Sequence, residues 1–366
     1  MSIQKLSKFV VLSIFILFAH PSEAQQAAKQ TAAGIIVEAT IPAPSLKGNL
    51  LGDATEQRIS VYLPPSYDTA PTKTYPVVYL LHPLGIGRHT WARDAGFNIL
   101  PVLNRMISGG KAREMIVVAP NARNAFNGSF YVNSATTGNW EDYIFRDVVG
   151  YIDANYRTLA RPSSRGIAGH SMGGFGAVSV GMKHADVFSA IYALSPCCLA
   201  MEGEFLEPLP AWTELSKVTS IDEVVNLPRT PDKFWTRAFP ALSAAFSPNA
   251  EKKPFYSDFL YREENGKLVR NEAVAAKWKA KMPLYMVEEY KSNLLALRGL
   301  FLDYGQNEQV AHIRIATALF SKALAERGIP HTFEIYAGNR DIEKVRERME
   351  RRVFVFFSET LDFAER

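Results

Sequence analysis

The most informative segment of this chain is Gly169-His170-Ser171-Met172-Gly173-Gly174. It follows the short apolar run Gly166-Ile167-Ala168 and precedes small and apolar residues, which is the pattern of a strand, a sharp turn and a helix. A serine at such a turn holds its hydroxyl clear of the sheet, and flanking glycines avoid clashes between strand and helix. The helix directs its first N–H groups at the same place. We therefore interpret Ser171 as a nucleophile; a turn that only connects is the alternative.

Apolar runs of strand length occur on both sides of this turn. Continuous β-branched and apolar runs are typical of parallel strands that are buried on both faces. They predict an α/β fold with a mostly parallel sheet of about eight strands and helices on both faces. Asn139 is expected to cap a helix, and the charged face of the closing helix is expected to be solvated. The strands are expected at residues 35–41, 57–63, 75–82, 115–120, 166–168, 190–195, 297–303 and 331–336.

Residues 196–291 interrupt this pattern. The segment contains three of the five tryptophans, Trp212, Trp235 and Trp278, and many Phe, Tyr and Pro residues. A long, aromatic and loop-rich insertion after the strand beyond the nucleophile is typical of a cap that shapes an acyl or alcohol pocket. A structural lid without substrate contact fits the same composition, and both interpretations stay open.

The first 24 residues have the composition of a secretion signal peptide. Lys5 and Lys8 precede an apolar run that Pro21 ends, and Ser22-Glu23-Ala24 offers small residues for cleavage. The run is too short for a membrane span, which needs about 20 residues. Cleavage removes two lysines and one glutamate, so the formal net charge falls from +4 to +3 and favours neither nucleic acid nor an anionic membrane as partner. We expect a secreted or periplasmic protein with one domain over residues 25–366; an uncleaved anchor is the alternative.

The two cysteines of the chain, Cys197 and Cys198, are adjacent. Because neighbouring cysteines rarely bridge each other, we expect no disulfide framework and assign the pair a packing role. A metal or redox role would need further ligands nearby, and the sequence indicates none.

The chain resembles a family of esterases that includes S-formylglutathione hydrolase (esterase D), bacterial feruloyl esterases and the antigen 85 mycolyltransferases. The resemblance rests on the turn around Ser171, the strand end Leu80-Leu81-His82 and the segment 133–140. It runs from about residue 55 to the C-terminus outside the insertion. It implies an α/β-hydrolase domain over residues 25–366 with the insertion 196–291, and neither metal nor organic cofactor.

The resemblance also implies further site residues. The family's acid lies in a Gly-x-x-Asp or Gly-x-x-Glu loop after the penultimate strand, and Gly305-Gln306-Asn307-Glu308 places Glu308 there. Asp303 at the strand end is the alternative acid, for which we expect only a loop hydrogen bond. In α/β hydrolases the oxyanion hole takes one N–H from the loop after an early strand and one from the residue after the nucleophile. We assign these N–H groups to Leu84 and Met172.

The family's histidine, in a Gly-x-His pattern after the last strand, is missing. The chain has Gly338-Asn339-Arg340-Asp341 there, so we expect the side chain of Arg340 or Asp341 in the place of the imidazole. An arginine stays protonated and cannot act as a base. A guanidinium in this place is expected about 3 Å from Glu308 in a charge-assisted pair.

Other histidines offer no clear replacement. His331 begins the last strand and is expected near the opposite edge of the sheet, since a strand rises about 3.3 Å per residue. His170 is expected to point away into the packing. His82 and His312 are expected on the correct edge, where either could substitute, although we interpret both as structural.

A serine hydroxyl needs a neighbouring base, and an oxyanion hole alone leaves an acceleration of only about 10³–10⁴ over water. We therefore predict a secreted serine esterase-like hydrolase that acts on carboxylic esters through Ser171 with impaired activity. Its substrate would be a small-molecule, lipid or glycan ester. A hydrolase-fold binding protein without turnover and an acyltransferase are the alternatives.

Overall fold

An eight-stranded sheet organises the computed structural model, which describes residues 33–92 and 96–363. The strand order is β1-β2-β4-β3-β7-β8-β11-β12. β2 is antiparallel to both β1 and β4, and all other neighbouring pairs are parallel. This confirms the predicted mostly parallel sheet. The strands are β1 (Ile35–Pro42), β2 (Glu56–Leu63), β3 (Val77–Leu81), β4 (Ile116–Pro120), β7 (Arg165–His170), β8 (Ala190–Leu194), β11 (Gly299–Gly305) and β12 (Thr332–Tyr336).

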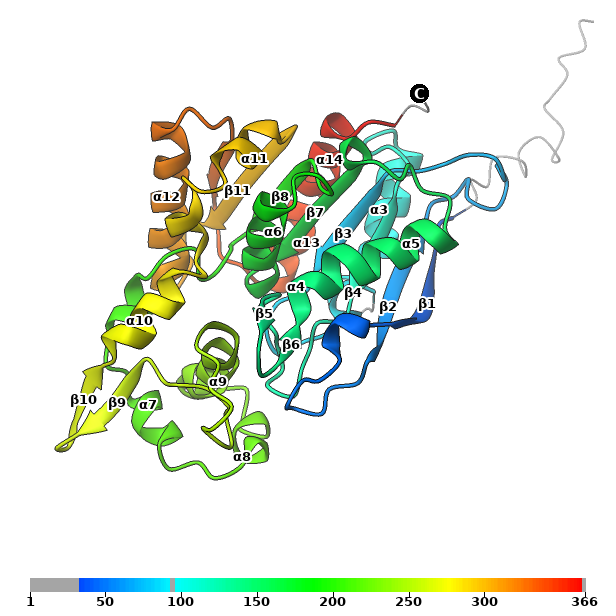
Figure 1. The fold of residues 1–366 in the computed structure, drawn as a ribbon. Helices are drawn as coiled ribbons and strands as arrows, with labels where there is room; N and C mark the ends of the chain where they lie inside the picture. Colours follow the sequence, from blue (N-terminus) through cyan, green and yellow to red (C-terminus); the bar gives the residue numbers. More distant parts are fainter. Residues whose placement is uncertain (1–32, 93–95, 364–366) are drawn as a thin grey trace, which may run out of the picture. The chain divides into compact units, whose positions relative to one another are not determined.

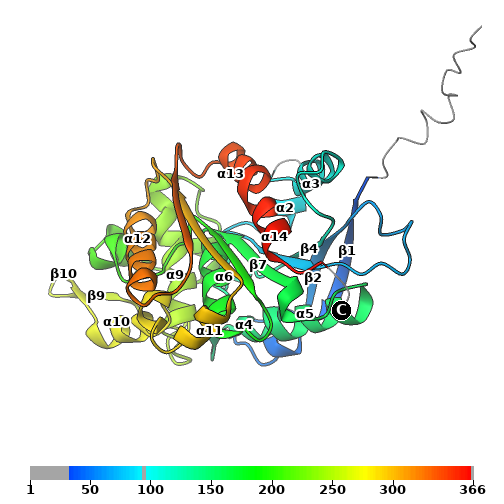
Figure 2. The ribbon, with the colours of Figure 1, turned by 90° about the horizontal axis from the view of Figure 1, so that it is seen from above.

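Side chains of the buried strands alternate between two apolar cores, one on each face of the sheet. Val77, Tyr79 and Leu81 of β3 belong to the larger core, whereas Val78 and Leu80 belong to the smaller one. This period of two is the pattern of a strand that is covered on both faces. Figure 2 shows α3, α13 and α14 on one side of the sheet and α4, α5, α6 and α11 on the other. Helices therefore cover both faces, as predicted.

The helices of the two faces have the following bounds. The smaller core is covered by α2 (His89–Ala92), α3 (Ile99–Ser108), α13 (Ile342–Arg348), the π-helical turn η7 (Met349–Val353) and α14 (Phe354–Thr360). The larger core is covered by η1 (Pro44–Leu46), α4 (Trp140–Asp142), η2 (Tyr143–Val148), α5 (Val149–Asn155), α6 (Met172–Lys183), α11 (Lys291–Ala296) and α12 (Ala311–Glu326). The short elements β5 (Asn133–Ser134), β6 (Gly138–Asn139) and η3 (Pro162–Ser164) complete this part of the chain.

Residues 196–291 form small helices and one hairpin, which Figure 1 shows gathered at one end of the sheet. Their aromatic side chains pack on one another: the rings of Trp212 and Phe239 stack with centroids 3.9 Å apart, and Trp278 meets Phe246 edge-on. These residues belong to the larger core of the sheet. The elements are η4 (Gly203–Leu206), α7 (Pro210–Leu215), α8 (Ile221–Val225), η5 (Pro231–Lys233), α9 (Phe234–Phe246), β9 (Tyr261–Glu264), β10 (Lys267–Arg270), α10 (Glu272–Lys279) and η6 (Pro283–Met286).

The expected cap at the start of α4 is wrong. Asn139 forms no side-chain cap; instead Asn133 Oδ1 accepts hydrogen bonds from the N–H groups of Glu141 and Asp142 at 3.0 and 3.1 Å. The cause is the pairing of β5 with β6, which places Asn133 opposite Asn139 and turns its amide toward the helix start.

The expected signal peptide over residues 1–24 lies outside the described residues. Within residues 33–92 and 96–363, no helix is both long enough and apolar enough to cross a membrane.

Candidate active site

Ser171 lies between the last residue of β7 and the first residue of α6, with φ at 56° and ψ at −114°. A positive φ at a residue other than glycine costs about 1–3 kcal/mol. Backbone hydrogen bonds hold this conformation. The Ser171 N–H donates to Leu194 O at 3.0 Å, and the Ser171 carbonyl accepts the N–H groups of Phe175 and Cys197 at 3.0 and 3.2 Å.

Two glycines make the turn possible. A β-carbon on Gly169 would overlap the backbone of Gly173, and a β-carbon on Gly173 would overlap the backbone of Leu81 in β3. Strand and helix therefore approach each other more closely than any other residue type permits at these positions. The glycines on both sides of Ser171 thus permit the close packing of strand and helix that forces the serine into its strained conformation.

Arg340 lies between Ser171 and Glu308. Its Nη1 donates to Ser171 Oγ at 3.1 Å, and its Nε lies 3.0 Å from Glu308 Oε2. The Glu308 side chain is 1% exposed, and its other oxygen accepts the Val310 N–H at 3.0 Å. Asp341, the other residue considered for this place, caps α13 by accepting the Lys344 N–H. The guanidinium thus spans the gap between the serine and the carboxylate.

Asp303, the alternative acid, is engaged elsewhere. Its Oδ2 accepts hydrogen bonds from Tyr192 Oη at 2.7 Å and from Arg348 Nη2 at 2.8 Å. Complete burial, partly offset by Arg348, raises its pKa to about 6. The expected loop hydrogen bond is wrong because Asp303 lies within β11. The expected solvated face is wrong at Arg348, which is buried because it neutralises Asp303 and Glu334.

Leu84 and Met172, the predicted oxyanion residues, lie next to each other. A β-carbon on Gly128 would come within 2.5 Å of Leu84 Cδ1 and 2.6 Å of Met172 Sδ, so the two side chains meet over this glycine. Both residues line the same cavity as Ser171. For neither N–H do the described residues supply a backbone acceptor. Their role as donors stays a prediction.

His82 and His331 are hydrogen-bonded away from Ser171. His82 Nε2 accepts the Ala122 N–H at 2.9 Å, and burial lowers the pKa of this imidazole to about 4. His331 Nε2 lies 2.8 Å from Ser321 Oγ. His82 thus binds the backbone after β4, and His331 binds a side chain of α12.

His170 follows the expectation that its side chain points into the packing. Its ring meets Phe97 of the smaller core edge-on, with ring centroids 5.5 Å apart, and both ring nitrogens are buried without a hydrogen-bond partner among the described residues. The residue also borders the cavity beside Ser171. Burial, followed by the positive charge of Arg340, lowers its pKa to about 3. A neutral imidazole of such low basicity is a poor candidate for the base.

His312, at the start of α12, is held by Glu204 of η4. Its Nδ1 lies 2.9 Å from Glu204 Oε2, and the same carboxylate accepts the N–H groups of Ala311 and His312 at 2.7 and 2.9 Å. The ring stacks on Phe205 with centroids 4.4 Å apart. Sequence reasoning missed Glu204, because nothing in its local pattern distinguishes it from a surface carboxylate.

The expectation that no further ligand lies near the cysteines is wrong. Ligand atoms of Cys197, Cys198 and His312 all lie within 4.8 Å of one another, because α12 brings its first turn to the loop after β8. Zinc bonded to two thiolates at about 2.3 Å in a tetrahedral site separates the sulfurs by about 3.7 Å. The two sulfurs here are 2.8 Å apart, with Cys198 donating to Cys197. The arrangement fits a thiol–thiolate contact better than a metal chelate.

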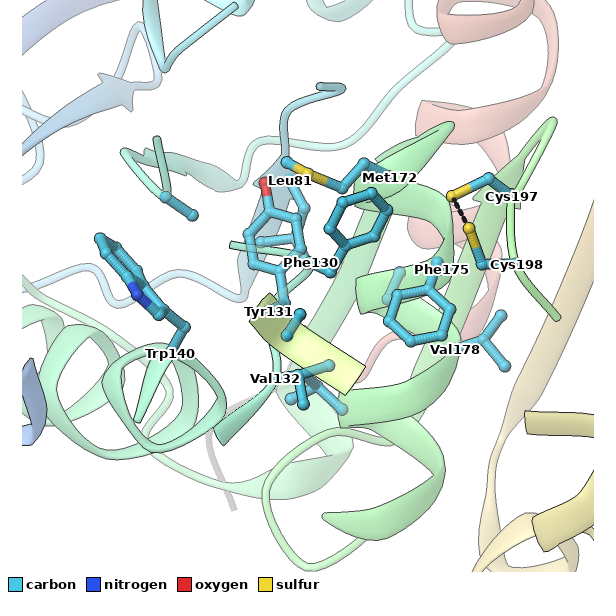
Figure 3. Packing of buried hydrophobic residues seen from close by; sticks show 14 of the residues in the cluster. Leu81, Phe130, Tyr131, Val132, Trp140, Met172, Phe175, Val178, Cys197 and Cys198 are labelled. Atoms are coloured by element: carbon cyan, nitrogen blue, oxygen red, sulfur yellow. Dashed lines mark hydrogen bonds between the residues drawn. The ribbon is translucent and has the colours of Figure 1, made fainter. Parts of the chain in front are cut away.

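Ser171, Arg340, Cys197 and His312 line one cavity of about 640 Å³. His170, Asp341 and Glu343 are further lining residues with polar side chains. Figure 3 shows part of the site, with Phe130 beside Met172 and with Cys197 and Cys198 in contact. Such a space suits a ligand with an apolar group and one carbonyl or carboxylate. The apolar wall includes Leu84, Ile86, Phe130, Phe234, Trp235, Ala238, Leu242, Val310, Ile313 and Ile342, four of them from residues 196–291.

The family model described as "Putative esterase" matches residues 54–351. The chain belongs to this esterase family. Among curated proteins, an esterase of Mycobacterium tuberculosis is 34% identical over 137 residues, which make up 36% of this chain and 27% of that protein. An endo-1,4-β-xylanase/feruloyl esterase of Xylanibacter ruminicola is 29% identical over 137 residues, 36% of this chain and 18% of that protein. The matches thus span at most about a quarter of these relatives.

Solved structures of esterases share the fold. A ferulic acid esterase superposes with a TM-score of 0.61 at 21% identity, over 90% of this chain and 99% of that one. An S-formylglutathione hydrolase of Agrobacterium tumefaciens superposes with a TM-score of 0.56 at 17% identity, over 91% and 98% of the two chains. The predicted α/β-hydrolase fold and membership of the esterase family are therefore confirmed.

Proposed function

We propose that this member of the esterase family binds carboxylic esters in the cavity and hydrolyses them slowly through Ser171. The hydrogen bond from Arg340 Nη1 to Ser171 Oγ carries the proposal. A guanidinium only donates hydrogen bonds and keeps its proton, so it cannot take the proton of the serine. Without a base, the site would retain only the roughly 10³–10⁴-fold acceleration over water that binding and an oxyanion hole supply.

The neighbouring groups have distinct roles in this reaction. The Leu84 and Met172 N–H groups would stabilise the negative oxygen that forms when Ser171 Oγ attacks the ester carbonyl. Glu308 fixes the guanidinium, and the apolar wall would hold the acyl or alcohol group. The substrate class is a small-molecule, lipid or glycan ester, met outside the cytoplasm if the N-terminal signal directs secretion.

Replacing Arg340 with histidine tests this proposal. We expect Arg340→His to raise kcat/KM for p-nitrophenyl acetate by about 10²–10⁴, because an imidazole between Ser171 and Glu308 would complete a triad whose members act as a unit. The same variant should also react faster with a fluorophosphonate probe at Ser171.

Two controls separate a gained base from a lost arginine. Arg340→Gln removes the charge without supplying a base, so it should remain near the wild-type rate. Adding Ser171→Ala to Arg340→His should remove the gain. An Arg340→His enzyme that is no faster than Arg340→Gln would contradict the proposal.

A binding protein without turnover is the second candidate, favoured by the cationic Arg340 in a cavity whose wall is mostly apolar. Such a site would bind an aryl or alkyl carboxylate, and Arg340→Gln would weaken that binding in a calorimetric titration. Binding without any turnover or probe labelling, even in Arg340→His, would favour this candidate.

A further inference from the structure

A second constellation of reactive groups opens into the cavity beside Ser171. Cys197 lies in the loop after β8, His312 lies in the first turn of α12, and Glu204 belongs to η4. Glu204 engages His312 Nδ1 at 2.9 Å, which leaves Nε2 for the sulfur of Cys197. Nε2 is buried and has no hydrogen-bond partner among the described residues, and the ligand atoms of His312 and Cys197 lie within 4.8 Å of each other. The order sulfur, imidazole, carboxylate is that of an activated nucleophile with an oriented base.

The surroundings stabilise a negative sulfur at Cys197. Burial alone would raise the pKa of this thiol, but the hydrogen bond from Cys198, the nearby imidazole of His312 and the charges of His312 and Arg340 lower it to about 6. Burial acts to lower the pKa of His312, yet its contacts with Cys197 and Glu204 raise it above the ordinary value. Cys198 is the opposite case, since burial and the neighbouring Cys197 sulfur raise its pKa. The two adjacent cysteines are therefore chemically distinct.

We propose that Cys197, His312 and Glu204 form a second nucleophilic site, in which the Cys197 sulfur accepts the acyl group of a carboxylic ester. The thiolate attacks the carbonyl carbon, the C–O bond to the alcohol breaks, and the imidazolium of His312 protonates the leaving alkoxide. Neutral His312 then takes a proton from water, the resulting hydroxide displaces the sulfur from the thioester, and the acid product and thiolate are released. No oxidant or reductant is needed. Glu204 is a positioning residue that keeps Nε2 directed at the sulfur.

This proposal rests on the proposed function in one respect only, the choice of carboxylic esters as the substrate class. Its chemistry supplies what the serine site lacks, because His312 can exchange a proton and Arg340 cannot.

Thiol alkylation tests the site without any ester. Iodoacetamide is applied at pH 6.5 to Cys198→Ser, which keeps only Cys197, and to Cys197→Ser, which keeps only Cys198. Peptide mass spectrometry should show Cys197 modified about tenfold faster, since its larger thiolate fraction outweighs its lower intrinsic nucleophilicity. The rate at Cys197 should rise through a pH of about 6, where an ordinary thiol titrates near 8.5.

Variants in the Cys198→Ser background assign the cause. His312→Gln should slow alkylation of Cys197 by about tenfold, whereas Glu204→Gln, which keeps the hydrogen-bonding shape, should slow it less. His331→Gln, the same exchange at a histidine outside the cavity, should leave the rate unchanged. If His312→Gln fails to fold, the pH profile of Cys197 still decides between an activated and an ordinary thiol.

Acyl trapping tests the reaction itself. After a short incubation with p-nitrophenyl acetate and an acid quench, Ser171→Ala should carry a hydroxylamine-labile acetyl group on Cys197. Acetyl groups on Ser171 alone in the wild type, with none on Cys197 in either protein, would overturn this inference and leave the serine proposal standing. An acetyl group on Cys197, together with no rise of kcat/KM in Arg340→His, would support this inference and contradict the serine proposal.

Three further results would overturn the inference. Equal alkylation rates at the two cysteines would show that neither is activated. One tightly bound zinc ion per chain that blocks alkylation until it is chelated would make the cluster a metal centre. Thiols that react only after reduction would show a disulfide between the two neighbours.

Discussion

Ser171 has a backbone conformation with positive φ that residues other than glycine rarely adopt. Three backbone hydrogen bonds hold it in this conformation. The strain of about 1–3 kcal/mol is concentrated at the residue whose hydroxyl must stand clear of the sheet. The conformation that destabilises the fold at Ser171 is therefore the one that its proposed role as a nucleophile requires.

Relief of this strain is measurable. Ser171→Gly should unfold with a free energy about 1–2 kcal/mol higher than Ser171→Ala, because glycine accepts a positive φ and alanine does not. Both variants lose the hydroxyl and its contact with Arg340, so their comparison isolates the backbone term. Urea denaturation gives both values, and equal stabilities would argue against strain at this turn.

Single residues also show how far the sequence predicts the site. Ser171 is predictable because its glycines, strand and helix are contiguous, and Glu308 is placed by a loop next to a recognisable strand. Cys197, Glu204 and His312 come from three separate segments, so no local pattern links them. Their proximity follows from how α12 packs beside η4 and the loop after β8, which is a tertiary property.

Among the elements, α13 is tied to the sheet by an ion pair in an apolar setting. Arg348 of α13 neutralises Asp303 of β11 and also meets Glu334 of β12. This tie explains why the closing helix departs from the sequence prediction. Its run of charges is typical of a solvated face, and the pattern carries no mark of the one arginine that turns inward to a buried carboxylate. The strands were predictable because their apolar runs report burial on both faces directly.

The Asp303 tie makes stability depend on pH with a defined sign. Its pKa is raised from 3.8 to about 6 on folding, so the folded state holds this proton more tightly than the unfolded chain. The stabilisation from protonated Asp303 is complete below about pH 4 and is lost as pH rises through about 6.

The matched comparison is between the wild type and Asp303→Asn. Between pH 4 and pH 7 the free energy of unfolding of the variant should improve relative to the wild type by about 2 kcal/mol, which is most of the effect of a pKa raised by about two pH units. Urea denaturation at both pH values measures it. A difference between the two proteins that does not change with pH would contradict the assigned direction of the pKa shift.

For the whole molecule, the insertion and the sheet share their largest core. Trp212 and Trp278 of the insertion are buried in the same apolar cluster as β3 and α6. The insertion was recognisable from its break in the α/β pattern, but its shared core was not, because aromatic composition alone does not reveal what the rings pack against.

A shared core predicts one cooperative unfolding transition. Three of the five tryptophans lie in the insertion, so tryptophan fluorescence samples this segment, whereas far-ultraviolet circular dichroism reports all helices and strands. The two signals should follow the same urea curve. An earlier fluorescence transition would identify the insertion as an independently unfolding unit.

The codon for Arg340, whose guanidinium lies between Ser171 and Glu308, determines how many base exchanges separate it from histidine. The arginine codons CGU and CGC become histidine codons when one G is exchanged for A, whereas the remaining arginine codons need at least two exchanges. A gene that encodes residue 340 with CGU or CGC lies one transition from a histidine codon at this position. The synonymous codon, which leaves the protein unchanged, therefore decides whether random mutagenesis under selection for ester hydrolysis reaches Arg340→His in one step.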